Sequence, residues 1–352
     1  MEFVERRRSA PPNASVRLIA AGVVFGFCYW ASTVLITLVV SILFAYLLDP
    51  LVELLERVRV PRAVGSLATV LVALALVGVL IWGVADRADQ FAQSWPEYSA
   101  VLKRATGAVQ ERLQKIETMF AEIAGQEKRP RTPEVQVREE SPVRALLLRG
   151  LGGLYSALLA LSFIPFLVFF MLAGKRDLWH GTMQLFPPSE RTRVRDALEA
   201  VSRMLRGFIV GNLIVALILA TLSAIFFRII GLDYPVLLGA VSGVLNLVPY
   251  LGVVLAWLPP LLIGLTKFRM WELVGIAVVI SIFHLIAINF LVPSLVGKKV
   301  HLNALTVTLG LMFWGWLWGG MGLILAIPIL ATIKVVCDHV EDWQPLGRWL
   351  GT

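Results

Sequence analysis

The chain has 352 residues, of which 58% are hydrophobic and only 16% are charged. Soluble domains carry about 25% charged residues, so this composition excludes an ordinary soluble protein and predicts a membrane protein. The net charge of +8 does not indicate nucleic-acid binding, because the basic residues flank apolar runs and form no single stripe. Cys28 and Cys337 form no disulfide framework or metal-ligand spacing, and we expect no cofactor.

Seven stretches contain no Asp, Glu, Lys or Arg. They are 18–48, 63–85, 150–174, 207–227, 234–266, 273–297 and 302–333. A helix needs about 20 apolar residues to cross the hydrocarbon, and four of these runs fit one crossing each. The other three are too long for one helix, so each is predicted to be a helical hairpin. The first of them is also far longer than the core of a signal peptide, and we expect it to be retained.

The breaks in the long runs are predicted by their residues. Proline removes a backbone donor, so a continuous helix through Pro249 is not expected. Glycines and Pro328 interrupt 302–333, whereas 18–48 has only Ser32 and Thr33 near its centre. The fold class is therefore an all-α polytopic membrane protein with about 8 transmembrane helices or half-helices, including helical hairpins, plus a small helical extramembrane segment.

The basic loops set the expected orientation. The segments 1–17, 49–62 and 175–206 are rich in Lys and Arg, which predicts the cytoplasmic side for them and for both termini. If 18–48 were a single helix, 175–206 would face outward. Likewise, 234–266 is either a hairpin entering from outside or one kinked crossing. Hairpins at 234–266 and 302–333 would enter from opposite faces and enclose a polar pocket near the midplane.

Four regions follow along the chain. They are an N-terminal membrane hairpin and third helix (1–85), an extracytoplasmic helical segment with a linker (86–149), the main transport membrane domain (150–333) and a cytoplasmic tail (334–352). Apolar residues recur at helical spacing over 95–123, and 126–142 is polar and proline-bearing. Residues 189–206 are predicted to form a cytoplasmic amphipathic helix that starts at Ser189 and rests on lipid headgroups.

Polar residues inside the apolar runs are the candidate solute-binding groups. They are Asn246, Pro249, Tyr250, Gly252, His284 and Asn289. A helix broken over 246–252 frees peptide groups that a polar ligand could satisfy; a kink filled by water is the alternative. For His284 and Asn289 the alternative is a hydrogen bond between helices. No carboxylate lies in the seven runs, which argues against a proton relay, and no catalytic motif is present, so we expect no enzyme.

Several motifs resemble those of the autoinducer-2 exporter family. The stretch Asn-Leu-Val-Pro-Tyr-Leu-Gly over 246–252 is similar to that family's Ile-Pro-Tyr-Leu-Gly-Pro hallmark. Further matching blocks are 48–56, 60–62, 206–217, 289–300 and 319–328. Val253 stands where the family usually has proline, and Asn212 where glutamine is common.

The resemblance implies a multi-pass transporter of the bacterial inner membrane, with an elevator-like moving part. It also implies a homo-oligomer, with a pentamer as one implied form. Members export the quorum-sensing signal autoinducer-2 or exchange sodium for protons. The function expected is therefore transport or export of a small polar solute, with a sodium/proton antiporter and a non-transporting membrane scaffold as alternatives. The expected partners are membrane lipids, a small-molecule substrate and further copies of the chain.

Overall fold

The computed structural model describes residues 14–79, 82–83, 115, 162–246, 248, 252–295 and 302–351. The described residues form helices and no strands. Five of the helices are long and apolar enough to cross a membrane, and three shorter apolar helices accompany them. This confirms the predicted all-α polytopic fold. The helix over 95–123 and the linker over 126–142 fall outside the described residues, apart from Lys115.

The helices follow one another along the chain. They are α1 (Ala14–Trp30), α2 (Ser32–Arg57), Arg62–Val79, Ser162–Ala173, α5 (Lys175–Gln184), α6 (Arg191–Ile229), α7 (Pro235–Leu245), α8 (Gly252–Gly264), α9 (Met270–Ile286), the π-helical turn η1 (Ala287–Leu291), α10 (Val292–Leu295), α11 (Ala304–His339), the 3-10 turn η2 (Glu341–Trp343) and α12 (Gln344–Leu350).

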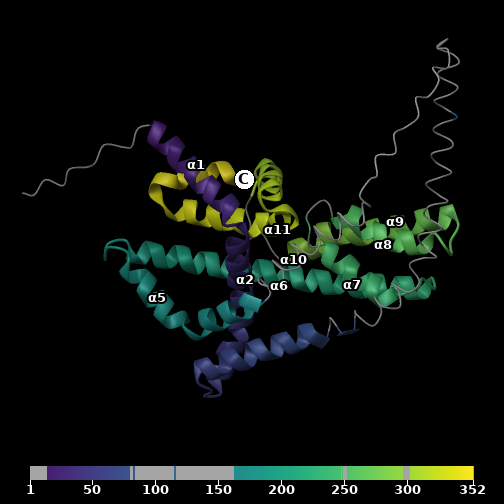
Figure 1. The fold of residues 1–352 in the computed structure, drawn as a ribbon, viewed down its shortest axis with the longest axis horizontal. Helices are drawn as coiled ribbons and strands as arrows, with labels where there is room; N and C mark the ends of the chain where they lie inside the picture. The colour runs from purple at the N-terminus through teal and green to yellow at the C-terminus, as the bar shows by residue number, and fades with distance from the viewer. Residues whose placement is uncertain are drawn as a thin grey trace, which may run out of the picture.

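Helix α6 is the element on which the others pack. Its 39 residues would reach about 58 Å, well beyond the hydrocarbon thickness of about 30 Å. Figure 1 shows α7, α8 and α9 at its C-terminal end, whereas α11 lies over its N-terminal part. The predicted hairpins over 234–266 and 302–333 therefore pack on different parts of α6.

The predicted amphipathic helix over 189–206 is the first part of α6, which begins after Glu190 and not at Ser189. Two residues of its apolar stripe are covered by protein. Val201 and Leu205 are buried against Ala331 of α11, together with neighbouring side chains of α2. For Val201 and Leu205, packing inside the chain takes the place of the expected contact with lipid headgroups.

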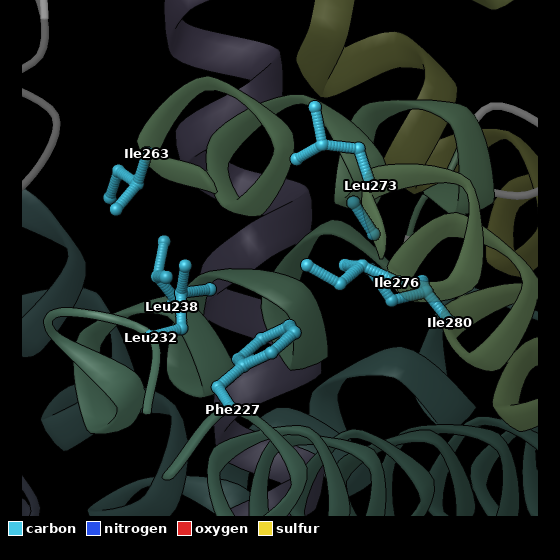
Figure 2. Packing of buried hydrophobic residues seen from close by; sticks show 8 residues of the cluster. Phe227, Leu232, Leu238, Ile263, Leu273, Ile276 and Ile280 are labelled. Atoms are coloured by element: carbon cyan, nitrogen blue, oxygen red, sulfur yellow. The ribbon is translucent and has the colours of Figure 1, made fainter. Parts of the chain in front are cut away.

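The run 234–266 forms the predicted hairpin. Helices α7 and α8 have 11 and 13 residues, so each is shorter than the roughly 20 residues that one crossing needs. A buried apolar cluster holds the hairpin between α6 and α9, as Figure 2 shows. Phe227, at the end of α6, is fully buried there beside Leu238 of α7, Ile263 of α8 and Ile276 of α9.

Glycines allow α7 to approach α6 very closely. A Cβ at Gly239 would lie 2.5 Å from the Ala220 carbonyl oxygen, and one at Gly243 would lie 2.5 Å from that of Ala216. The order of these contacts shows that the two helices run antiparallel. Small residues bring helices together in this way in membranes. The Gly-xxx-Gly spacing thus serves a contact within the chain.

Helix α11 is itself a hairpin, as predicted for 302–333. Gly319 has φ 60° and ψ −139°, a conformation that residues with a Cβ rarely adopt. The segments on either side of Gly319 fold back on each other. The evidence is that a Cβ at Gly315 would lie 2.7 Å from the Leu323 side chain. A Cβ at Gly322 would overlap the carbonyl oxygen of Trp314. The glycines are therefore required by the reversal of the chain.

The C-terminal segment over 334–352, predicted to be a cytoplasmic tail, is helical. Helix α11 continues to His339, and α12 packs back on it. Asn303 joins the two ends of this unit. Its Oδ1 accepts from the Thr306 N–H at 2.7 Å and caps α11, while its Nδ2 donates to the Trp349 carbonyl at 2.7 Å.

The run 18–48 contains a bend and not the expected hairpin. Ala31 alone separates α1 from α2, with φ −88° and ψ 17°. Helical hydrogen bonds continue on both sides, from Ala31 N to Phe27 O at 2.8 Å and from Leu35 N to Ala31 O at 3.0 Å. One residue near helical geometry cannot reverse the chain, and Figure 1 shows the two helices meeting at an angle. The centre of this run holds no proline or glycine to force a turn.

Arg62 clamps three segments together at the end of α2. Its guanidinium donates to Asp49 at 2.9 Å, to Glu56 at 2.7 Å and to the Leu172 carbonyl at 2.8 Å. Lys175 adds a contact to Asp49 at 2.5 Å. Asp49 and Arg62 are almost fully buried, with side chains 11% and 12% exposed. A buried carboxylate needs such partners, so this cluster fixes how the segments meet.

We predict that Gly243→Ala destabilises the protein by roughly 1–3 kcal/mol, because the added methyl group meets the Ala216 backbone, which cannot rotate away. The change lowers the midpoint of thermal unfolding in detergent. Gly275→Ala is the matched control, since nothing lies within 4 Å of its Cβ position in α9. Equal effects of the two substitutions would contradict the close packing.

We predict that the glycines at the tip of α11 differ sharply in tolerance. Gly322→Ala forces the hairpin open against the Trp314 carbonyl and lowers the yield of folded protein, measured by size-exclusion chromatography. Gly320→Ala meets nothing within 4 Å and is expected to change stability by less than about 1 kcal/mol. If Gly322→Ala folded as well as Gly320→Ala, the reversal at Gly319 would be wrong.

Candidate functional site

The break between α7 and α8 lies where the sequence predicted it. Helix α7 ends at Leu245 with Asn246 as its C-terminal cap, and α8 begins at Gly252. The Gly252 N–H bonds to the Val248 carbonyl at 2.9 Å, and a Cβ at Gly252 would lie 2.6 Å from the Leu245 carbonyl oxygen. Gly252 therefore serves the tight turn. Pro249 and Tyr250 fall outside the described residues.

Asn246 and His284 are brought together across 38 residues. Asn246 Oδ1 lies 2.5 Å from His284 Nδ1, and the tautomer of the imidazole decides the direction of this hydrogen bond. The contact ties the broken end of α7 to α9.

Two serines complete a polar group that the sequence analysis did not identify. Ser223 of α6 and Ser242 of α7 are both buried, and their Oγ atoms lie 3.5 Å apart. Ser242 precedes Asn246 by four residues, so both share one face of α7. That spacing was a usable signal, whereas nothing in the sequence pairs Ser223 with them.

These side chains line one small cavity between α6, α7, α8 and α9. Its lining is Leu219, Ser223, Ser242, Asn246, Val253, Ala256, Ile280, Phe283 and His284. The volume of about 10 Å³ is near the room that one water molecule needs. The polar groups therefore satisfy one another, and the site is closed to an organic solute in this conformation. No charged side chain is among the lining residues.

Asn289 lies apart from this cavity. It is exposed, and its Nδ2 donates to the Leu285 carbonyl at 2.8 Å. It belongs to the π-helical turn before Pro293, where the Val292 N–H bonds to the Ala287 carbonyl. Proline has no N–H with which to continue the α-helical hydrogen bonds, which accounts for the wider π-helical turn before it. The structure thus unites Asn246 with His284 but leaves Asn289 outside.

The two hairpins do not enclose the polar cavity together. The tip of α11 packs on α1, where Trp318 Nε1 donates to the Cys28 carbonyl at 3.1 Å and Trp316 stacks on Phe25. Among the described residues, α11 does not contact α7 or α8. The expected pocket between opposed hairpins is therefore corrected, because each hairpin packs on its own part of α6.

Comparisons with known proteins point in one direction. The profile described as AI-2E family transporter matches residues 18–342. The Bacillus subtilis protein YrrI is 28% identical over 331 residues, which cover 87% of this chain and 86% of YrrI. The Escherichia coli K12 protein named AI-2 transport protein TqsA is 24% identical over 324 residues, covering 90% and 89% of the two chains.

A further relative, the Escherichia coli K12 protein PerM, is 24% identical over 364 residues and covers 96% of both chains. The similarity therefore extends over nearly the whole sequence, including both hairpins. This similarity agrees with the all-α fold, in which five helices of the described residues are long enough to cross a membrane. The chain belongs to the AI-2E family of membrane transporters.

Proposed function

We propose that this protein carries a small, uncharged polar solute of the autoinducer-2 type across the bacterial inner membrane. The observation that supports this most is the hydrogen bond between Asn246 and His284 at a helix break. The groups around it are two hydroxyls, an amide and an imidazole, with no formal charge. Such a lining suits hydrogen bonding to hydroxyl or carbonyl groups better than binding of an ion. The relative TqsA is named as an AI-2 transport protein.

Transport requires the cavity to open. A space of about 10 Å³ admits no organic solute, so the α7–α8 hairpin has to separate from α9. The Asn246–His284 contact then breaks, and both groups become free to bind the solute. Exchange of one hydrogen-bonding partner for another costs little net free energy. The site thus alternates between a self-satisfied state and a solute-bound state.

The orientation follows from where the basic segments meet. Arg62 and Lys175 share Asp49, and Arg193 pairs with Glu341, so 49–62, 175–206 and the C-terminal residues lie at one end. Short basic loops face the cytoplasm. We place this end there. Because the run 18–48 bends at Ala31 and does not fold back, the N-terminus is not assigned to the same side. Assembly into a homo-oligomer, as the family resemblance implies, is part of the proposal.

We predict that Asn246→Ala lowers solute flux about tenfold, because the solute loses a hydrogen bond worth roughly 1–1.5 kcal/mol. Flux of autoinducer-2 is measured in proteoliposomes at equal protein content. Asn289→Ala is the matched control, since that amide is exposed and bonded within its own helix. Loss of flux in both variants, or in neither, would contradict the assignment of Asn246 to the solute site.

The same proteoliposomes decide between the solute transporter and the sodium/proton antiporter. Imposed sodium and pH gradients are expected to leave no coupled ion flux in the wild-type protein. An ion flux abolished by His284→Ala, without flux of the organic solute, would establish the antiporter and overturn the proposal.

We also expect Pro249→Ala and Tyr250→Ala to impair flux more than folding, since both belong to the segment between α7 and α8. Flux is compared with the unfolding midpoint of each variant. Normal transport by the double variant, at equal amounts of folded protein, would remove these two residues from the site.

A further inference from the structure

A second cavity lies away from the solute site. It is enclosed by α2, the helix Ser162–Ala173, α5 and the first part of α6, and none of its lining residues borders the cavity at Asn246. Its volume of about 380 Å³ falls within the range of small-molecule sites. The transport proposal does not use this space, so its occupant needs a separate explanation.

The cavity has an apolar end and a charged end. Ile42 and Ala45 line it within the apolar part of α2, whereas Asp49 and Lys175 line it where charged residues begin. In a membrane helix that change marks the boundary between hydrocarbon and headgroups. A ligand that fits both ends has an apolar chain and a polar head at this depth.

The acidic groups at the charged end are already neutralised. Asp49 is bonded by Arg62 at 2.9 Å and by Lys175 at 2.5 Å. Glu56 is bonded by Arg62 at 2.7 Å and by Arg176 at 3.3 Å. These carboxylates therefore do not favour a cationic head.

Lys175 and two arginines offer hydrogen-bond donors beside the cavity. The Lys175 ammonium has three N–H groups, and among the described residues it contacts Asp49 and Glu53, which balance its charge; its side chain is 40% exposed. Arg195 and Arg206 share the face of α6 that carries the lining residues Leu198 and Ser202, because the spacings are three and four.

Both arginines are exposed. Neither makes an ion pair with a side chain in the described part of the chain. Glu199, on the same face, is paired with Arg203 at 3.6 Å. These two arginines therefore supply positive charge on the face of α6 that borders the cavity, which suits phosphate, since arginine and lysine both bind it.

We propose that this cavity binds one anionic phospholipid. The phosphate lies against Lys175, Arg195 and Arg206, and the first part of an acyl chain covers Ile42 and Leu198. The bound lipid bridges α2, α5 and α6, and so fixes the N-terminal part of α6 on which α11 packs.

The test is a lipid titration of the full-length protein, followed by native mass spectrometry. Phosphatidylglycerol is compared with phosphatidylethanolamine as the zwitterionic lipid and with glycerol 3-phosphate as the free phosphate. We expect saturable binding of phosphatidylglycerol, at least fivefold tighter than that of phosphatidylethanolamine. Glycerol 3-phosphate is expected not to displace it.

Arginine variants locate the site without touching the Asp49 cluster. Arg195→Gln and Arg206→Gln are each expected to weaken phosphatidylglycerol binding about tenfold, as loss of one charge-assisted hydrogen bond implies. Arg228→Gln is the control, because it removes an exposed arginine from the opposite end of α6. Equal weakening by Arg228→Gln, no preference for phosphatidylglycerol, or full displacement by glycerol 3-phosphate would each overturn the proposal.

Discussion

The close approach of α7 to α6 is the constraint from which the solute site follows. Because Gly239 and Gly243 bring the backbones together, Ser242 reaches Ser223, and the broken end of α7 is carried to His284. Peptide groups freed inside a membrane must be covered by protein or by a polar cavity. Here the covering elements are α6 and α9, and the polar cavity is the candidate site.

Helix α6 gives the molecule two separate halves. Its C-terminal part carries α7 and α8, with the polar cavity, and its N-terminal part carries α2 and α11. The hairpin at α7–α8 and the hairpin of α11 therefore pack on different parts of α6. The buried pairing of Asp49 with Arg62 holds the other end of α2 to its neighbours.

Much of this fold could be predicted from the sequence, and the failures have clear causes. The breaks over 246–252 and near Gly319 could be predicted from prolines and glycines, because these residues act locally on the backbone. The run 18–48 was predicted as a hairpin from its length and from the basic segments on both sides of it, and without a breaker it only bends. Asn246 and His284 were identified as polar groups at membrane depth. Their contact, and the part of Ser223, depend on helix packing that no local pattern records.

The Arg62 cluster has a consequence for biosynthesis. The Arg62 guanidinium donates to a carbonyl 110 residues further along the chain, at Leu172. A ribosome adds about 5–20 residues per second, so roughly 6–22 s pass before that carbonyl has been made. During this interval the nascent chain holds Asp49 and Glu56 next to an arginine with an incomplete set of acceptors. The full set of Arg62 contacts therefore forms only after Leu172 has been synthesised.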